Sequence, residues 1–161
     1  MEQEQEQEEQ KQDKLLYDMM KVYLAQVDSA IKISNILCEH SGKENKELTG
    51  DDIICGLVYR LMIPMKQEEI DECMDNAEKI LDPEESGEEE ESEEEELFDQ
   101  IENYDKPTIS RKIKSNQCNC DICSQVRICL CNYESFEPTD PLCQRFKDSI
   151  QKTCSEHKIY I

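Results

Sequence analysis

The sequence contains few of the residues that common catalytic sites and membrane segments require. Among 161 residues it has only two histidines and four glycines, which leaves few candidates for a histidine-based catalytic pair and excludes a Gly-rich phosphate-binding loop. It has no run of 18 apolar residues, so no membrane helix is predicted. Its first residues, MEQEQEQEEQ, do not resemble a signal peptide. We therefore expect a non-enzymatic intracellular protein of the nucleus or cytoplasm.

Basic residues are also scarce, and the resulting negative charge is unevenly distributed. The chain has 39 acidic and 18 basic residues, a net charge of -21. Residues 82–105 contain 14 acidic residues and no basic one, whereas residues 106–115 contain four basic residues and no acidic one. Direct DNA binding needs clustered Lys and Arg and is not expected without a basic partner. The acidic tract favours a basic protein, such as a histone, as that partner.

Changes in composition divide the chain into four predicted segments. Residues 1–12 are a Glu/Gln-rich tail, which we expect to be disordered or a frayed helix. Residues 13–82 are a helical dimerisation domain, residues 83–115 an acidic and then basic linker that is disordered in its acidic part, and residues 116–161 a small Cys-rich module. The predicted fold class is all-α.

The longest helical pattern runs from Asp13 to His40. Its apolar residues recur at spacings of three and four, and no Gly or Pro interrupts it before Ser41-Gly42, where Gly42 suits a left-handed cap. Such a helix extends roughly 42 Å, which is more than one small domain covers, so its apolar face is expected to contact a partner. The residues assigned to this contact, on the long helix and on the next one, are Leu16, Met20, Tyr23, Val27, Ile31, Ile54, Leu57 and Leu61.

The sequence LTGDD at residues 48–52 introduces a second, shorter helix. Thr49 is a suitable N-cap, and Asp52 three residues later can complete a capping box. Gly56 on the apolar stripe of this helix indicates either a close approach by another backbone or a small residue that the helix merely tolerates. Residues 66–81 predict a third, amphipathic helix.

The long helix, the polar connection and the capped short helix together resemble the second half of the histone fold. The resemblance lies in ELTGDDIICGL at residues 47–57 and in MKVYL at residues 20–24, which is similar to the start of a histone central helix. It covers residues 13–64. It implies handshake dimerisation, as a homodimer or with another subunit, and a role in chromatin packaging or transcription. The first helix, the loop that follows it and the basic surface of histones have no counterpart in this sequence.

Seven of the ten cysteines lie in the last segment, with spacings that indicate a zinc site. Tetrahedral zinc needs four thiolate or imidazole ligands. CNCDIC at residues 118–123 supplies the first group of ligands, and the second remains open between CLC at residues 129–131, whose thiols would share one face of a strand, and CSEH at residues 154–157. The candidate ligands are Cys118, Cys120, Cys123, Cys129, Cys131, Cys154 and His157.

The alternative is that several of these cysteines are buried apolar residues of a helical cap. Cys143 is assigned to such a core, on a helix that Asp140 caps and Pro141 begins. Two functions follow from these observations. The first is a histone-like interaction subunit, and the second is a zinc-binding adaptor or an acidic protein that resembles a histone chaperone.

Overall fold

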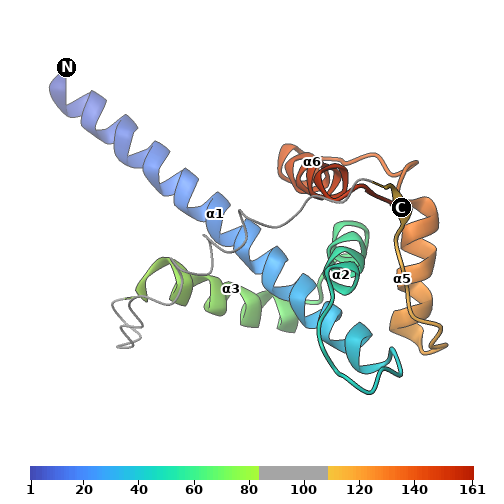
Figure 1. Cartoon of the computed structure of the whole chain (residues 1–161). Coiled ribbons are helices and arrows are strands. Elements are labelled where there is room, and N and C mark those ends of the chain that lie inside the picture. Colours follow the sequence, from blue (N-terminus) through green and yellow to red (C-terminus); the bar gives the residue numbers. More distant parts are fainter. Residues whose placement is uncertain (84–108) are drawn as a thin grey trace.

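The computed structural model describes residues 1–83 and 109–161, and these are folded mainly as helices, so the predicted all-α fold class is confirmed (Figure 1). The acidic tract lies outside the described residues. The elements are α1 (Glu2–Glu39), α2 (Gly50–Met62), α3 (Gln67–Leu81), β1 (Arg111–Lys112), α5 (Asp121–Asn132), α6 (Pro141–Glu156) and β2 (Ile159–Tyr160). The two short strands pair in parallel, with Arg111 opposite Ile159.

Helix α2 occupies the centre of the packing. It lies between α1 on one side and α5 and α6 on the other, while α3 packs along α1 (Figure 1). The main core joins all of these helices except α3, and Val58 of α2 is fully buried within it. A smaller core, built around Ala25, Cys73 and Ala77, joins α3 to α1. The fold is therefore a set of helices arranged around α2.

The Cys-rich segment is not a separate module. Val126 of α5 and Ile150 of α6 belong to the same core as Leu37 of α1 and Val58 of α2. The strand β1 lies in the segment that the sequence predicted as a linker, and Ile113 just after it is buried. The packed core therefore does not end at residue 115, where the sequence predicted a boundary. The reason is that α5 and α6 cover the apolar surface of α2 on the side away from α1.

Helix α1 is longer than its apolar pattern predicted. Residues 1–12 were expected to be disordered or a frayed helix, but residues 2–12 form about three turns of α1, and their side chains are exposed. Glu, Gln and Lys are good helix formers, so this part of α1 depends on local propensity rather than on packing. At the other end, Gly42 has a φ of 70°, which confirms the predicted left-handed cap.

Most of the α1 and α2 residues expected to contact a partner are covered by this chain itself. Six are buried or half-buried, and these are Tyr23, Val27, Ile31, Ile54, Leu57 and Leu61. Only Leu16 and Met20 are exposed, at 58% and 47%. Helix α6 lies against α1, where the ring of Phe146 meets that of Tyr23 edge-on with centroids 5.6 Å apart. The sequence could not show this coverage, because it comes from a helix more than 100 residues away.

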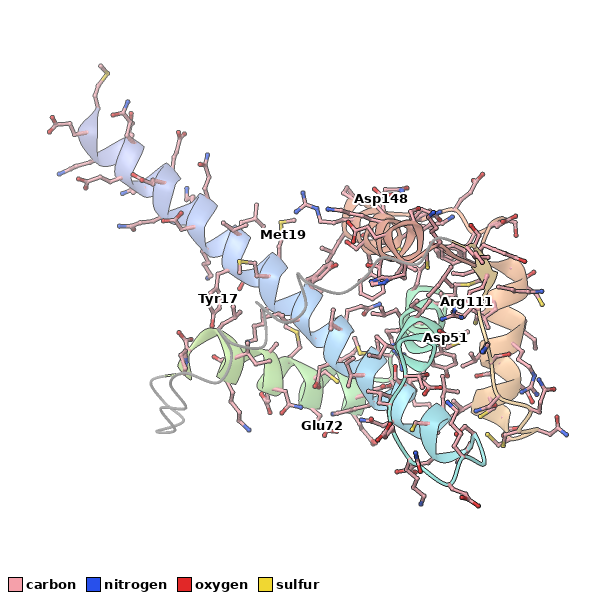
Figure 2. The ribbon with its side chains drawn as sticks, in the orientation of Figure 1. Tyr17, Met19, Asp51, Glu72, Arg111 and Asp148 are labelled. Atoms are coloured by element: carbon pink, nitrogen blue, oxygen red, sulfur yellow. The ribbon has the colours of Figure 1, made fainter. Side chains whose placement is uncertain are left out.

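Helix α2 begins as the sequence predicted. The Thr49 hydroxyl accepts a hydrogen bond from the Asp52 N–H at 3.2 Å, and the Asp52 carboxylate accepts one from the Thr49 N–H at 3.0 Å. The neighbouring Asp51 accepts two hydrogen bonds from Arg111, at 2.6 and 2.8 Å, and one from the Lys114 N–H at 2.8 Å (Figure 2). The start of α2 is thus tied to β1.

Gly56 marks a close approach of two helices. A Cβ atom at this position would collide with the Ser34 hydroxyl and the Ala30 carbonyl oxygen of α1, and would lie 3.1 Å from the Ser34 nitrogen. Of the two explanations left open by the sequence, the close approach is therefore confirmed. Glycine at this position lets α2 lie directly on the backbone of α1.

We expect Gly56→Ala to lower the free energy of unfolding by about 1–3 kcal/mol, because the cost of overpacking exceeds the roughly 1 kcal/mol that alanine gains in helix propensity. Urea denaturation measures the difference. Gly50→Ala is the matched control, since a Cβ at Gly50 meets no atom within 4 Å. Equal stability of the two variants would contradict the close approach.

The Asp51 carboxyl group makes the stability of the protein depend on pH. Burial alone would raise the pKa of Asp51, but the hydrogen bonds from Arg111 and from the Lys114 N–H lower it below its ordinary value. A carboxyl group with a lowered folded-state pKa stabilises the fold above its unfolded-state pKa, which is about 4, and this contribution is lost as the pH falls through the folded-state value. We expect Asp51→Asn to destabilise the protein by about 1–2 kcal/mol at pH 7.

The difference in unfolding free energy between the wild type and Asp51→Asn should shrink progressively below pH 4, as measured by urea denaturation at a series of pH values. Asp148→Asn, which changes an exposed carboxylate of α6, is the control and should change stability little at any pH. A difference for Asp51→Asn that stays constant down to pH 2 would contradict the role of the ionised carboxylate.

Candidate metal centre

Two distant segments supply the only group of metal-ligating side chains found in the described part of the chain. His40 lies at the C-terminal end of α1, and CNCDIC at residues 118–123 leads into α5. Cys120 is the N-cap of α5, where its sulfur accepts a hydrogen bond from the Cys123 N–H at 3.5 Å. Cys123 follows in the first turn and is buried, whereas Cys118 is half-buried in the preceding loop.

The four ligand atoms lie at mutual distances that suit a common metal ion. The Nδ1 atom of His40 lies 3.2 Å from the Cys120 sulfur, 3.5 Å from that of Cys123 and 3.6 Å from that of Cys118. All four atoms lie within 4.8 Å of one another. In a tetrahedral site with metal–sulfur distances of about 2.3 Å and metal–nitrogen distances of about 2.0 Å, a nitrogen and a sulfur ligand are roughly 3.5 Å apart. The His–Cys distances are close to this spacing, so the cluster could hold a metal ion.

Polar side chains around the cluster hold its residues in place. Asn116 donates hydrogen bonds to the Leu37 carbonyl oxygen at 3.0 Å and to the Cys123 sulfur at 3.3 Å. The guanidinium of Arg127 donates to the carbonyl oxygens of Asn116 and Cys118, at 3.0 and 2.7 Å. Such outer hydrogen bonds orient metal ligands and sustain metal affinity. Here they fix the cysteine loop against the end of α1.

The thiols of the cluster differ in acidity. Hydrogen bonds to the Cys120 sulfur, first from the Cys123 N–H and then from neighbouring side chains including His40, lower the pKa of Cys120 to about 6. Burial raises the pKa of Cys123 to about 11. Cys120 is therefore the more acidic of these two thiols. A bound metal ion favours the ionised form of every thiol that it contacts.

The cysteines expected to complete the site do not join it. Cys129 and Cys131 lie on helix α5 rather than on a strand, and two residues along a helix rotate a side chain by roughly 200°. Cys129 therefore points into the core and Cys131 into solvent. Cys154 is also buried in the main core, and His157 is exposed at the end of α6. Burial in the core was the alternative stated for these cysteines, and it holds for Cys129 and Cys154.

Sequence reasoning assigned Cys118, Cys120 and Cys123 to the site but missed His40. The spacing of His157 three residues after Cys154 favoured the wrong histidine, because short spacings are the usual signal of a ligand pair. His40 lies 78 residues before Cys118. The sequence offered one signal for His40. CNCDIC supplies three thiols, a tetrahedral site needs a fourth ligand, and the chain has only two histidines that could provide an imidazole.

Comparison of the chain with protein-family models, curated proteins and solved structures gave no match. In the described residues, no helix combines the length and the apolar character that crossing a bilayer requires. The metal cluster and the exposed surface of the helices are therefore the features from which a function is inferred.

We expect the purified protein to contain one equivalent of metal, measured by plasma emission on a sample prepared with a thiol reductant. His40→Ala and Cys123→Ser each remove one of four ligands and should lower the metal affinity at least tenfold. His157→Ala and Cys131→Ser are matched controls, because both side chains are exposed and outside the cluster. Loss of metal in the controls, with its retention in His40→Ala, would contradict the site.

Proposed function

We propose that the protein is a non-enzymatic interaction subunit whose fold is held by a structural zinc ion. The observation that carries this proposal is the convergence of three thiols and one imidazole, from segments about 80 residues apart, within 4.8 Å. Thiolate-rich tetrahedral sites favour zinc. Four protein ligands leave no open position for a substrate or a water molecule, which favours a structural role over a catalytic one.

The place of the cluster in the fold supports a structural role. His40 ends α1 and the cysteines begin α5, so a bound ion would link the first helix to the C-terminal helices. The core beneath this link includes Leu37 and Cys123. Binding energy from a metal whose ligands come from separate segments stabilises the folded state, because the unfolded chain does not hold the ligands together.

Exposed apolar side chains on α1 favour protein binding. Five such residues follow one another on the middle of this helix, at exposures of 40–61%: Leu15, Leu16, Met19, Met20 and Val22. Clusters of this kind on a soluble protein commonly mark an interaction surface. The acidic composition of the chain makes a basic partner the favourable one.

The histone-like function stays a prediction. Handshake pairing would need a free apolar face along most of the long helix, but α6 covers this face near Tyr23. Ile54 and Leu61 of α2 are likewise buried within the chain. A role in chromatin or transcription therefore receives less support from the packing than the zinc-held adaptor does. Capture of a basic protein by the acidic tract stays a prediction, because that tract lies outside the described residues.

The test is to remove and restore the metal. Chelation under reducing conditions should lower the midpoint of thermal unfolding, and one equivalent of zinc should restore it. Cobalt added to the metal-free protein should give the visible spectrum of a tetrahedral thiolate complex, and His40→Ala should change that spectrum. A metal-free protein with an unchanged midpoint and no cobalt spectrum would overturn the proposal.

A further inference from the structure

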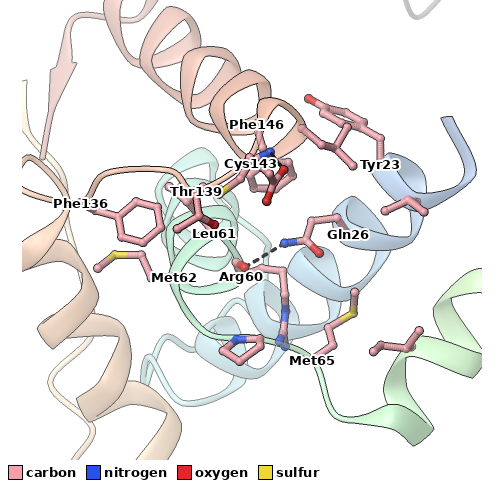
Figure 3. A pocket seen from close by; sticks show the side chains of 15 residues that line it. Tyr23, Gln26, Arg60, Leu61, Met62, Met65, Phe136, Thr139, Cys143 and Phe146 are labelled. Atoms are coloured by element: carbon pink, nitrogen blue, oxygen red, sulfur yellow. Dashed lines mark hydrogen bonds between the residues drawn. The ribbon is translucent and has the colours of Figure 1, made fainter. Parts of the chain in front are cut away.

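A largely apolar pocket lies beside α1. It has a volume of about 510 Å³ and is bordered by α1, the end of α2, the segment after α2 and the start of α6 (Figure 3). Val22, Tyr23, Leu61, Met65, Phe136 and Phe146 contribute to its lining. Pockets that hold ligands or anchoring side chains have volumes of roughly 300–1,000 Å³ and a similar apolar lining.

The exposed apolar residues of α1 continue this pocket along the helix. Leu15, Met19 and Val22 follow one another at spacings of four and three, so they lie on one face, and Val22 also lines the pocket. Figure 2 shows Met19 on α1, two residues after Tyr17, whose hydroxyl donates to Asp82 at the end of α3 at 2.8 Å. Pocket and stripe together form an elongated surface. Helices of partner proteins bind such surfaces through apolar residues spaced by three and four.

The floor of the pocket contains a buried arginine. Arg60 is only 3% exposed, and its guanidinium donates to the Ile63 carbonyl oxygen at 3.1 Å and to Glu69 at 2.8 Å. Gln26 donates to the Arg60 carbonyl oxygen at 2.9 Å (Figure 3). The Nε–H group of Arg60 has no acceptor among the described residues. The ion pair with Glu69 keeps the floor neutral, so it does not select an acidic ligand.

Charge beyond the stripe identifies the kind of occupant. Residues 2–13 of α1 carry six acidic side chains and one basic one. Glu4, Glu8 and Lys11 lie on the same helix face as Leu15, about three, two and one turns before it, so two of these three charges are negative. A second copy of the chain would bring another net charge of -21 to this surface, which opposes association. A segment with basic residues next to its apolar face is attracted instead.

From these observations we infer that the pocket and the Leu15–Val22 stripe bind a basic amphipathic helix of a partner protein. The inference rests on the proposed role as an interaction subunit and adds the surface and the chemistry of the partner. Apolar residues of the bound helix occupy the stripe and the pocket, and its Lys or Arg residues face Glu4 and Glu8.

The probe is a fluorescein-labelled 18-residue peptide with Leu along one helical face and Lys on the other. It is titrated with the zinc-loaded full-length protein at physiological ionic strength, and binding is measured by fluorescence anisotropy. We expect saturable binding that Leu15→Asp and Met19→Asp each weaken at least tenfold. Ile128→Asp is the matched control, because Ile128 is 59% exposed on α5 and outside the surface, and should change the affinity less than twofold. A peptide of the same composition with its Leu residues scrambled should bind at least tenfold more weakly.

Three results would overturn the inference. The first is that the peptide does not bind the wild-type protein. The second is that it binds Leu15→Asp and Met19→Asp as tightly as it binds the control variant. The third is that sedimentation shows a wild-type dimer that Met19→Asp dissociates, which would assign the stripe to a second copy of the chain. Metal content and circular dichroism are measured on the same samples. If the protein binds zinc but not the peptide, only this inference is contradicted. If the protein contains no metal, the proposed zinc-held subunit is contradicted.

Discussion

The burial of α2 between α1 and the C-terminal helices is the constraint on which the other features depend. Val58 is fully buried, and the missing side chain at Gly56 lets α2 lie directly on the backbone of α1. The opposite side of α2 is also apolar, so the chain must return to cover it. That return brings Arg111 to Asp51 and the cysteine loop to His40. The ion pair and the metal cluster are therefore consequences of how one short helix is buried.

The cluster and the ion pair join different pairs of elements. The Asp51–Arg111 pair joins the start of α2 to β1, and the cluster joins the end of α1 to the start of α5. Both use polar groups from segments that the apolar core has already brought close. A buried polar or ionic contact adds little net stability by itself, but it excludes packings in which its partners are separated. In this fold such contacts fix the position of the C-terminal helices.

Much of the local structure could be predicted from the sequence, because it depends on neighbouring residues. The capping box of Thr49 and Asp52, the left-handed Gly42 and the Asp140 cap of α6 were all correct. The helix at residues 121–132 was harder, since its alternating apolar residues also fit a strand. Contacts between distant segments could not be predicted. His40 as a ligand and the coverage of α1 by α6 depend on tertiary packing, which leaves no periodic signal in a single sequence.

Helix α1 combines a packed half with an exposed half, and this has a consequence for its dynamics. Starting a helix is the unfavourable step, whereas each further residue adds a hydrogen bond at lower cost. The turns packed against α2 and α3 supply the starting nucleus, from which the acidic turns extend without packing of their own. Amide hydrogen exchange should therefore quicken steadily from Ala25 back towards Glu2, as the turns fray in order from the exposed end. A binder on this half would stop the fraying and bring conformational order without having to create the helix.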